Sequence, residues 1–171
     1  PMKHLTILAA APLALGASAT ASAQAPGQKQ VQLIDTLTLP ELHSFLEAAD
    51  YRVLAVVEET KLLRIQGGED PAFYVQLEQC DREPGNRCAA IVILRPDGEL
   101  VAPPESVLMD ANRGFSGIKI VTLGPEKNVF YRRYVRLEGG VTPRYLLRQL
   151  VAFEVQYKNV AQHLRGRAAA E

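Results

Sequence analysis

The chain has 171 residues, 47% of them hydrophobic, and its 19 basic side chains equal its 19 acidic ones in number. This length suits one domain with a hydrophobic core of its own. The balance of charge argues against a general nucleic-acid binder, which needs a basic surface.

The first 23 residues have the order of a secretory signal peptide. A basic start with Lys3 precedes an apolar run over residues 5–17, and an Ala-Ser-Ala triplet ends at Ala23. Export signals share this order of charge, apolar stretch and small-residue cleavage site. The apolar run is too short, and too broken by proline and glycine, for a membrane anchor, which needs about 20 apolar residues. We therefore predict a signal peptide at residues 1–23 and a periplasmic or secreted protein.

A flexible tether is predicted next, at residues 24–38, and a single folded domain is predicted at residues 39–164. Thr38 can cap a helix over residues 40–50, because Pro40 suits a first helical turn and apolar side chains follow at helical spacing.

Four strands are expected after this helix. Apolar and polar side chains alternate in them, as in Leu63-Arg64-Ile65-Gln66, which is typical of a sheet with one buried face. Short segments rich in turn-forming residues separate the strands and predict an antiparallel meander. The strands are predicted at residues 53–57, 61–66, 72–79 and 88–94.

The second half of the chain adds two helices and two strands. Two prolines at positions 103 and 104 open a helix that is expected to end at residues 112–114. Strands are predicted at residues 117–123 and 128–137, and a long last helix is predicted from Thr142-Pro143 to residue 164, before a flexible tail at residues 165–171. The order αββββαββα predicts an α+β fold in which helices pack on one face of an antiparallel sheet.

Cys80 and Cys88 are the two cysteines of the chain. They flank a Pro-Gly-Asn turn, and an even cysteine count in an exported chain favours a disulfide that closes this loop. A redox or metal pair is the alternative, but CxxC spacing is absent and no histidine is near in sequence. We therefore predict a structural disulfide.

Four short phrases stand out within this order of elements: Phe45–Tyr51, Phe73–Leu77 with the two cysteines, Asn112-Arg113 followed by Phe115, and Gly139–Thr142 before an amphipathic helix. These phrases and the order of elements resemble the YbjN-like family, whose members are described as bacterial sensory transduction regulators. Asp50 departs from the family, in which a helix-ending glycine is common at this position, and Ala111 stands where the family often has tryptophan.

This resemblance covers about residues 39–164 and implies a fold like that of type III secretion chaperones, small proteins that often dimerise and bind extended protein segments. It carries no catalytic residues over to this chain. His43 and His163 have no nucleophile or metal ligand near them in sequence, and no nucleotide-binding or nucleophile motif is present. We therefore expect a non-catalytic protein without a metal or cofactor.

The last helix carries two neighbouring apolar stripes. One stripe suffices to cover a sheet, so the second is either additional core, which apolar stripes usually are, or a surface for a partner. The first stripe is Leu146, Leu150, Phe153, Tyr157, Val160 and Leu164, and the second is Leu147, Val151 and Val155.

The strand at residues 128–137 interleaves aromatic and arginine side chains. Tyr134 and Arg136 lie on one side of it with Phe130 and Arg132. Such a row can hold an acidic protein segment or an anionic lipid headgroup, but it is more often an exposed sheet face whose arginine stems cover neighbouring rings.

The sequence therefore predicts an exported protein-binding module with a chaperone-like or regulatory role in the cell envelope. Its partner is expected to be a protein, a peptide or a second copy of the chain, with no nucleic acid and no stable membrane insertion after cleavage. The predicted partner-binding residues are Leu147, Val151 and Val155, with Tyr134 and Arg136 as a secondary patch. The alternative is a small-molecule sensor or an uncharacterised enzyme with a pocket between helices and sheet.

Overall fold

The computed structural model describes residues 32–81, 86–100 and 102–168. The predicted signal peptide lies outside these residues. Within them, no helix is both long enough and apolar enough to cross a membrane.

Three helices and six strands follow one another in the predicted order, which confirms the α+β fold. Their bounds agree with the predicted ones to within a few residues, because alternating apolar positions and turn-forming residues set them locally. The elements are α1 (Leu39–Ala48), β1 (Tyr51–Val57), β2 (Leu62–Gly67), β3 (Phe73–Cys80), β4 (Cys88–Asp97), α2 (Glu105–Gly114), β5 (Lys119–Leu123), β6 (Asn128–Arg136) and α3 (Pro143–Ala168).

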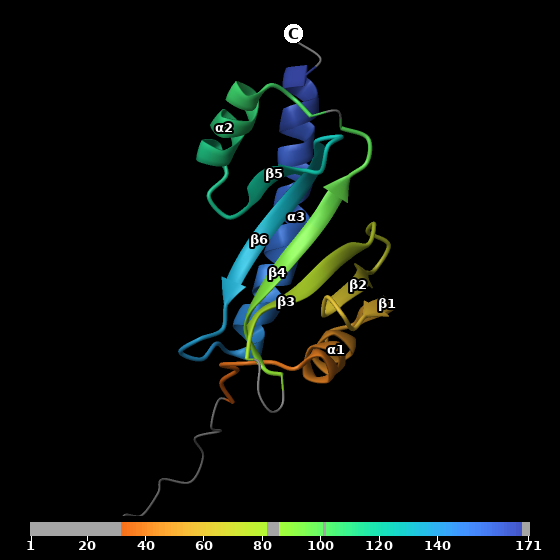
Figure 1. The fold of residues 1–171 in the computed structure, drawn as a ribbon, viewed down its shortest axis with the longest axis vertical. Coiled ribbons are helices and arrows are strands. Elements are labelled where there is room, and N and C mark those ends of the chain that lie inside the picture. The colour runs from red at the N-terminus through yellow and green to blue at the C-terminus, as the bar shows by residue number, and fades with distance from the viewer. Residues whose placement is uncertain (1–31, 82–85, 101, 169–171) are drawn as a thin grey trace, which may run out of the picture. The chain divides into compact units, whose positions relative to one another are not determined.

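The six strands form one antiparallel sheet in the order β1-β2-β3-β4-β6-β5, with β1 and β5 at its edges (Figure 1). In Figure 1, α3 runs behind the sheet, α1 lies beside β1 and α2 lies beside β5. The buried side chains of all three helices join one hydrophobic core with the sheet. The helices therefore cover one face of the sheet, and the other face is free of them.

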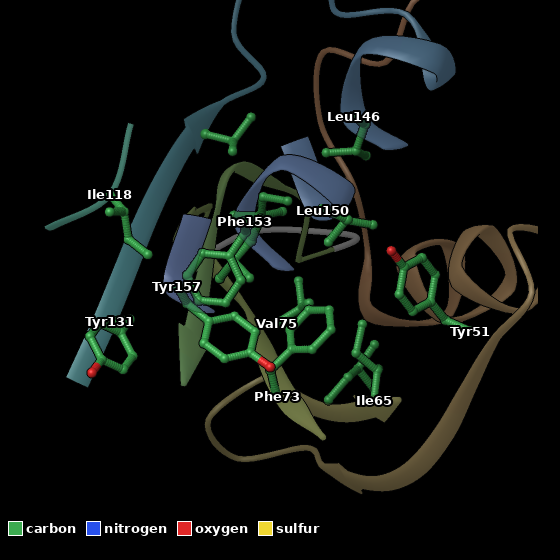
Figure 2. Close-up of a cluster of buried hydrophobic side chains, with 14 of the residues drawn as sticks. Tyr51, Ile65, Phe73, Val75, Ile118, Tyr131, Leu146, Leu150, Phe153 and Tyr157 are labelled. Atoms are coloured by element: carbon green, nitrogen blue, oxygen red, sulfur yellow. The ribbon is translucent and has the colours of Figure 1, made fainter. Parts of the chain in front are cut away.

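A row of five aromatic rings, two of them from α3 itself, runs through this core (Figure 2). Neighbouring ring centres in the row lie 5.7–6.2 Å apart, within the range that favours tilted and edge-to-face packing. The rings belong, in spatial order, to Tyr51, Phe73, Phe153, Tyr157 and Tyr131. Strands from both halves of the sheet are thus packed against the same helix.

The domain begins earlier than predicted. Leu37 is buried, and its N–H and C=O pair with Cys88 at N–O distances of 2.9 and 2.8 Å. Ile34 forms a similar bridge to Val141. The prediction of a flexible tether is therefore wrong for residues 34–38, because Leu37 fills the core and its backbone groups find partners.

The last helix also extends further than predicted. It continues to Ala168, so the predicted tail is wrong for residues 165–168. Arg165 and Arg167 lie in its last turn, where cations interact favourably with the negative end of the helix dipole. Arg165 also binds Asp97 at 3.2 Å, which ties this turn to the end of β4.

Thr38 caps α1 as predicted. Its hydroxyl accepts from the Glu41 N–H at 3.3 Å, and the Glu41 carboxylate accepts from the Thr38 N–H at 2.8 Å. Asp50 follows the helix with φ of +62°, the left-handed conformation that favours glycine. Asp50 thus takes a backbone conformation that glycine adopts without steric cost.

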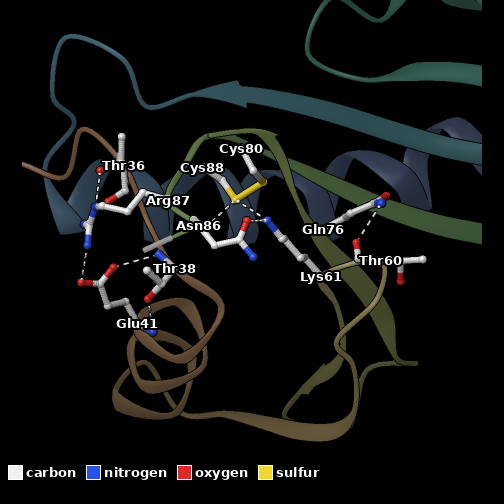
Figure 3. The surroundings of a disulfide bond; sticks show 10 residues. All are labelled: Thr36, Thr38, Glu41, Thr60, Lys61, Gln76, Cys80, Asn86, Arg87 and Cys88. Atoms are coloured by element: carbon white, nitrogen blue, oxygen red, sulfur yellow. Dashed lines mark hydrogen bonds and ion pairs between the residues drawn. A yellow bond between two sulfur atoms is a disulfide. The ribbon is translucent and has the colours of Figure 1, made fainter. Parts of the chain in front are cut away.

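The predicted disulfide is confirmed: Cys80 and Cys88 lie opposite each other on β3 and β4 and are bonded (Figure 3). Next to it, the Arg87 guanidinium donates to the Thr36 hydroxyl at 2.7 Å and to the Glu41 carboxylate at 2.9 Å. Arg87 thereby joins the β3–β4 hairpin to the N-terminal segment and to the first turn of α1.

Candidate functional site

The two apolar stripes of α3 have different environments. The stripe from Leu146 to Leu164 is buried, as predicted. The second stripe is divided: Leu147 packs against the core, whereas Val151 and Val155 are 47% and 56% exposed. The interpretation of the second stripe as core therefore holds for Leu147 and is wrong for the two valines.

Val151 and Val155 lie on a surface that we call the α3 outer face, defined as Arg144, Arg148, Val151 and Val155. These residues follow one another at spacings of four, three and four, so they share one side of the helix, and all four are exposed. The surface therefore combines two apolar side chains with two guanidinium groups.

Most of the charged side chains of α3 are positive. The helix contains five arginine or lysine residues and one carboxylate, Glu154. Lys158, Arg165 and Arg167 bind Asp70, Asp97 and Asp110 at 2.7, 3.2 and 4.0 Å. Within the part of the chain that the structure describes, Arg144 and Arg148 make no ion pair. The positive charge of the α3 outer face is thus available to a partner.

Glu154 does not neutralise the outer face, because it points toward the sheet. Its carboxylate accepts from the Tyr51 hydroxyl at 3.4 Å, and a Cβ on Gly67 would lie 2.8 Å from its Oε1. Burial raises the pKa of Glu154, and the nearby charge of Asp70 adds to this effect.

The secondary patch, Tyr134 and Arg136, lies on the other face of the sheet. Strand β6 alternates strictly: Arg133 donates to Gln149 of α3 at 2.9 Å, so its neighbour Tyr134 points away from the helix. The predicted division of this strand into two sides is confirmed. The structure does not bring the two predicted patches together.

Ion pairs already occupy the two β6 arginines of the helix-free face, Arg132 and Arg136. Arg132 reaches across β4 to Glu78 at 3.1 Å, and Arg136 lies 3.8 Å from Glu138. An acidic partner would compete with these carboxylates. The α3 outer face, whose arginines have no such competitor among the described residues, is the better candidate.

A second feature, a cavity of about 590 Å³, lies between the C-terminal half of α3 and the end of β4. Asp97 lies at its wall, where it accepts from the Tyr131 hydroxyl at 2.7 Å. Burial opposes ionisation of Asp97, but hydrogen bonds from Tyr131 and the Glu99 N–H and the charge of Arg165 outweigh burial and lower its pKa. The sequence left a pocket between helices and sheet as the alternative, but it did not identify the lining residues of this cavity, because they come from segments far apart in the chain.

The described residues hold no group of three histidine, cysteine or acidic side chains that could bind a metal ion. The two histidines of the domain lie apart from the cavity. His43 is 3.7 Å from Glu47 on α1, and the His163 ring packs edge-on against Phe115.

No family model matches the chain, and no curated protein matches it. Among solved structures, the chain is similar to the crystal structure of YbjN from E. coli, described as a candidate transcription regulator, with a TM-score of 0.57 and 15% sequence identity. The similarity covers 81% of this chain and 97% of that chain. At this identity the comparison establishes the fold, and it confirms the predicted resemblance at that level.

Proposed function

Because the chain has the YbjN-like fold, we propose that it is a non-catalytic binding module, exported to the cell envelope, where it has a chaperone-like or regulatory role. Its partner is an acidic protein segment with apolar side chains, which binds to the α3 outer face. The observation that carries this proposal is the exposure of Val151 and Val155 on a helix whose other apolar stripe is fully buried.

The apolar part of the surface supplies binding energy. Full burial of a valine side chain contributes about 1.5–3 kcal/mol, so covering two half-exposed valines recovers about as much as burying one. This energy is too small for a stable complex by itself, since micromolar affinity needs about 8 kcal/mol. Further contacts are therefore needed, and the two arginines beside the valines can make them.

Arg144 and Arg148 favour an acidic partner. Guanidinium groups form bidentate hydrogen bonds with carboxylates, which fix the orientation of the partner and strengthen binding. An amphipathic helix that presents acidic residues beside its apolar stripe would meet both features of the α3 outer face.

The same charges argue against a second copy of the chain as the partner. If two α3 helices packed antiparallel with Val151 of one copy against Val155 of the other, Arg148 of one copy would lie opposite Lys158 of the other. Parallel packing would place Arg148 beside Arg148. Both arrangements bring like charges together, fully in the parallel one and less in the antiparallel one, where Asp70 pairs with Lys158. An acidic partner avoids this repulsion and is therefore favoured over a second copy.

Export is part of this proposal and rests on the sequence of residues 1–23. The test is to isolate the protein from the envelope fraction of its source cells and to determine its N-terminus. A mature chain that begins at Gln24 is expected. An intact leader in the cytoplasmic fraction would contradict export and leave the binding surface to be tested separately.

Photo-crosslinking in the source cells tests the binding surface. A photoreactive amino acid is placed at Arg148 on the α3 outer face and, in a matched variant, at Arg136 on the helix-free face of the sheet. We expect a reproducible crosslink to an acidic protein from position 148 and none from position 136. The reverse pattern would assign binding to the secondary patch, and crosslinks to a second copy alone would show a homodimer instead.

A further inference from the structure

We propose that the cavity between α3 and the end of β4 binds a small organic carboxylate, which Arg95 holds. This site is separate from the α3 outer face and gives the module a small-molecule ligand in addition to its protein partner. The volume of about 590 Å³ lies within the usual range of ligand pockets, about 300–1,000 Å³.

The walls of the cavity are partly apolar. Tyr131 and Tyr157, whose ring centres lie 6.2 Å apart, form one side, and Pro71, Pro96 and Ala161 contribute aliphatic surface. A ligand with a small hydrocarbon body could therefore bury it here.

The acidic groups around the cavity already have donors. Asp97 accepts from the Tyr131 hydroxyl, from the backbone N–H groups of Glu99 and Leu100, and from Arg165. Its carboxylate is therefore satisfied and does not compete for a ligand-binding cation. Lys158 is likewise occupied, because its ammonium group binds both oxygens of Asp70 at 2.7 and 2.8 Å.

In contrast to Lys158, Arg95 makes no ion pair with any residue that the structure describes. Its guanidinium donates to the Pro71 carbonyl at 2.8 Å and lies 4.1 Å from the centre of the Tyr157 ring. These two contacts use one N–H and one face of the group and fix its position. The remaining N–H donors form a fixed planar fork, which is suited to a carboxylate.

Charge at the rim limits the ligand to a low negative charge. The Glu99 side chain is 86% exposed beside the cavity and would repel a polyanion. A monocarboxylate with a hydrocarbon body is thus favoured over an organic polyphosphate.

The experiment is a titration of the isotope-labelled mature chain with benzoate, followed by amide chemical shifts. Benzamide, which has the same shape without the charge, serves as the matched ligand. We expect saturable shifts at cavity residues with benzoate, and affinity for benzamide at least about tenfold lower. Equal affinity for both ligands, shifts away from the cavity, or no saturation up to about 20 mM benzoate would overturn the proposal.

Two variants are expected to change the affinity for benzoate in opposite directions. Arg95→Gln removes the charge and should weaken benzoate binding by about tenfold or more, whereas Glu99→Gln removes the rim repulsion and should strengthen it about twofold. Unchanged affinity in Arg95→Gln would contradict the assignment of Arg95. If Arg95→Gln does not fold, the comparison of benzoate with benzamide on the natural sequence still decides the matter. None of these results depends on the protein partner of the α3 outer face.

Discussion

The side chain of Asn112 pairs with both backbone polar groups of Ile120. Its amide donates to the Ile120 C=O at 2.9 Å, and its oxygen accepts from the Ile120 N–H at 2.8 Å. Ile120 lies on β5, an edge strand of the sheet, so Asn112 takes the place of a neighbouring strand at this point. Asn112 therefore has a structural role: it joins α2 to the edge of the sheet.

Asn112→Ala is expected to lower the free energy of unfolding by about 1–3 kcal/mol, because two hydrogen bonds are lost. Urea denaturation measures the loss, and hydrogen exchange of the Ile120 amide should become faster. Asn112→Asp keeps the acceptor and loses the donor. Its free energy of unfolding should therefore lie between that of Asn112→Ala and that of the natural sequence. An unchanged midpoint in Asn112→Ala would show that water replaces the side chain without cost.

The disulfide is expected to stabilise the domain by about 2–3 kcal/mol, because it closes a short loop in the unfolded chain. The variant with Cys80→Ala and Cys88→Ala should lose this amount in urea denaturation. The natural sequence should lose a similar amount on addition of a reductant, and the double variant should not respond to it. A reductant effect of equal size on both proteins would contradict this explanation.

Gly117 and Arg133 are expected to be energetically coupled. A Cβ on Gly117 would lie 2.5 Å from Arg133 Nη2 and 2.6 Å from Gln156 Oε1. Arg133 is 8% exposed and donates to Gln149 and Gln156, so it has little room to move. Gly117→Ala should therefore cost about 1–3 kcal/mol. The same change should cost clearly less in an Arg133→Ala background, as measured by a double-mutant cycle. Additive effects would show that Arg133 shifts freely.

The stability of the domain should depend on Glu154 in a pH-dependent way. Since burial raises the pKa of Glu154 above the ordinary glutamate value, the folded state holds this proton more tightly than the unfolded state does. Stability is therefore lost as the pH rises from the ordinary glutamate pKa through the raised one.

Glu154→Gln removes this penalty, so its melting temperature should exceed that of the natural sequence above this pH window and lose the advantage below it. Glu126→Gln, in the exposed turn before β6, is the matched control and should show no such pH-dependent difference. A Glu154→Gln curve parallel to that of the natural sequence at every pH would contradict the prediction.

The sequence allowed the elements to be predicted where the signal is local. The alternation of Leu63 and Ile65 with polar neighbours indicated a strand, and Thr38 before Pro40 indicated a helix start. Contacts between distant segments carry no such signal. The pairing of Leu37 with Cys88 and the bond from Tyr131 to Asp97 depend on how the sheet is assembled.

The exposure of the second stripe of α3 likewise could not be predicted from local sequence. Helical spacing placed Leu147 and the two valines on one stripe, but it could not say how far the core extends around the helix. In the structure, Leu147 packs against the core, and Val151 and Val155 are exposed beyond it. Exposure of a side chain thus depends on the neighbouring elements as much as on its position along the helix.

The most direct test of the binding surface combines Val151→Glu with the photoreactive amino acid at position 148. The structure predicts that this variant keeps the melting temperature of the natural sequence to within a few degrees, because Val151 is 47% exposed. It also predicts that the crosslink to the partner is lost. A folded variant that still crosslinks to the partner would contradict binding at the α3 outer face, and an unfolded variant would show that Val151 belongs to the core.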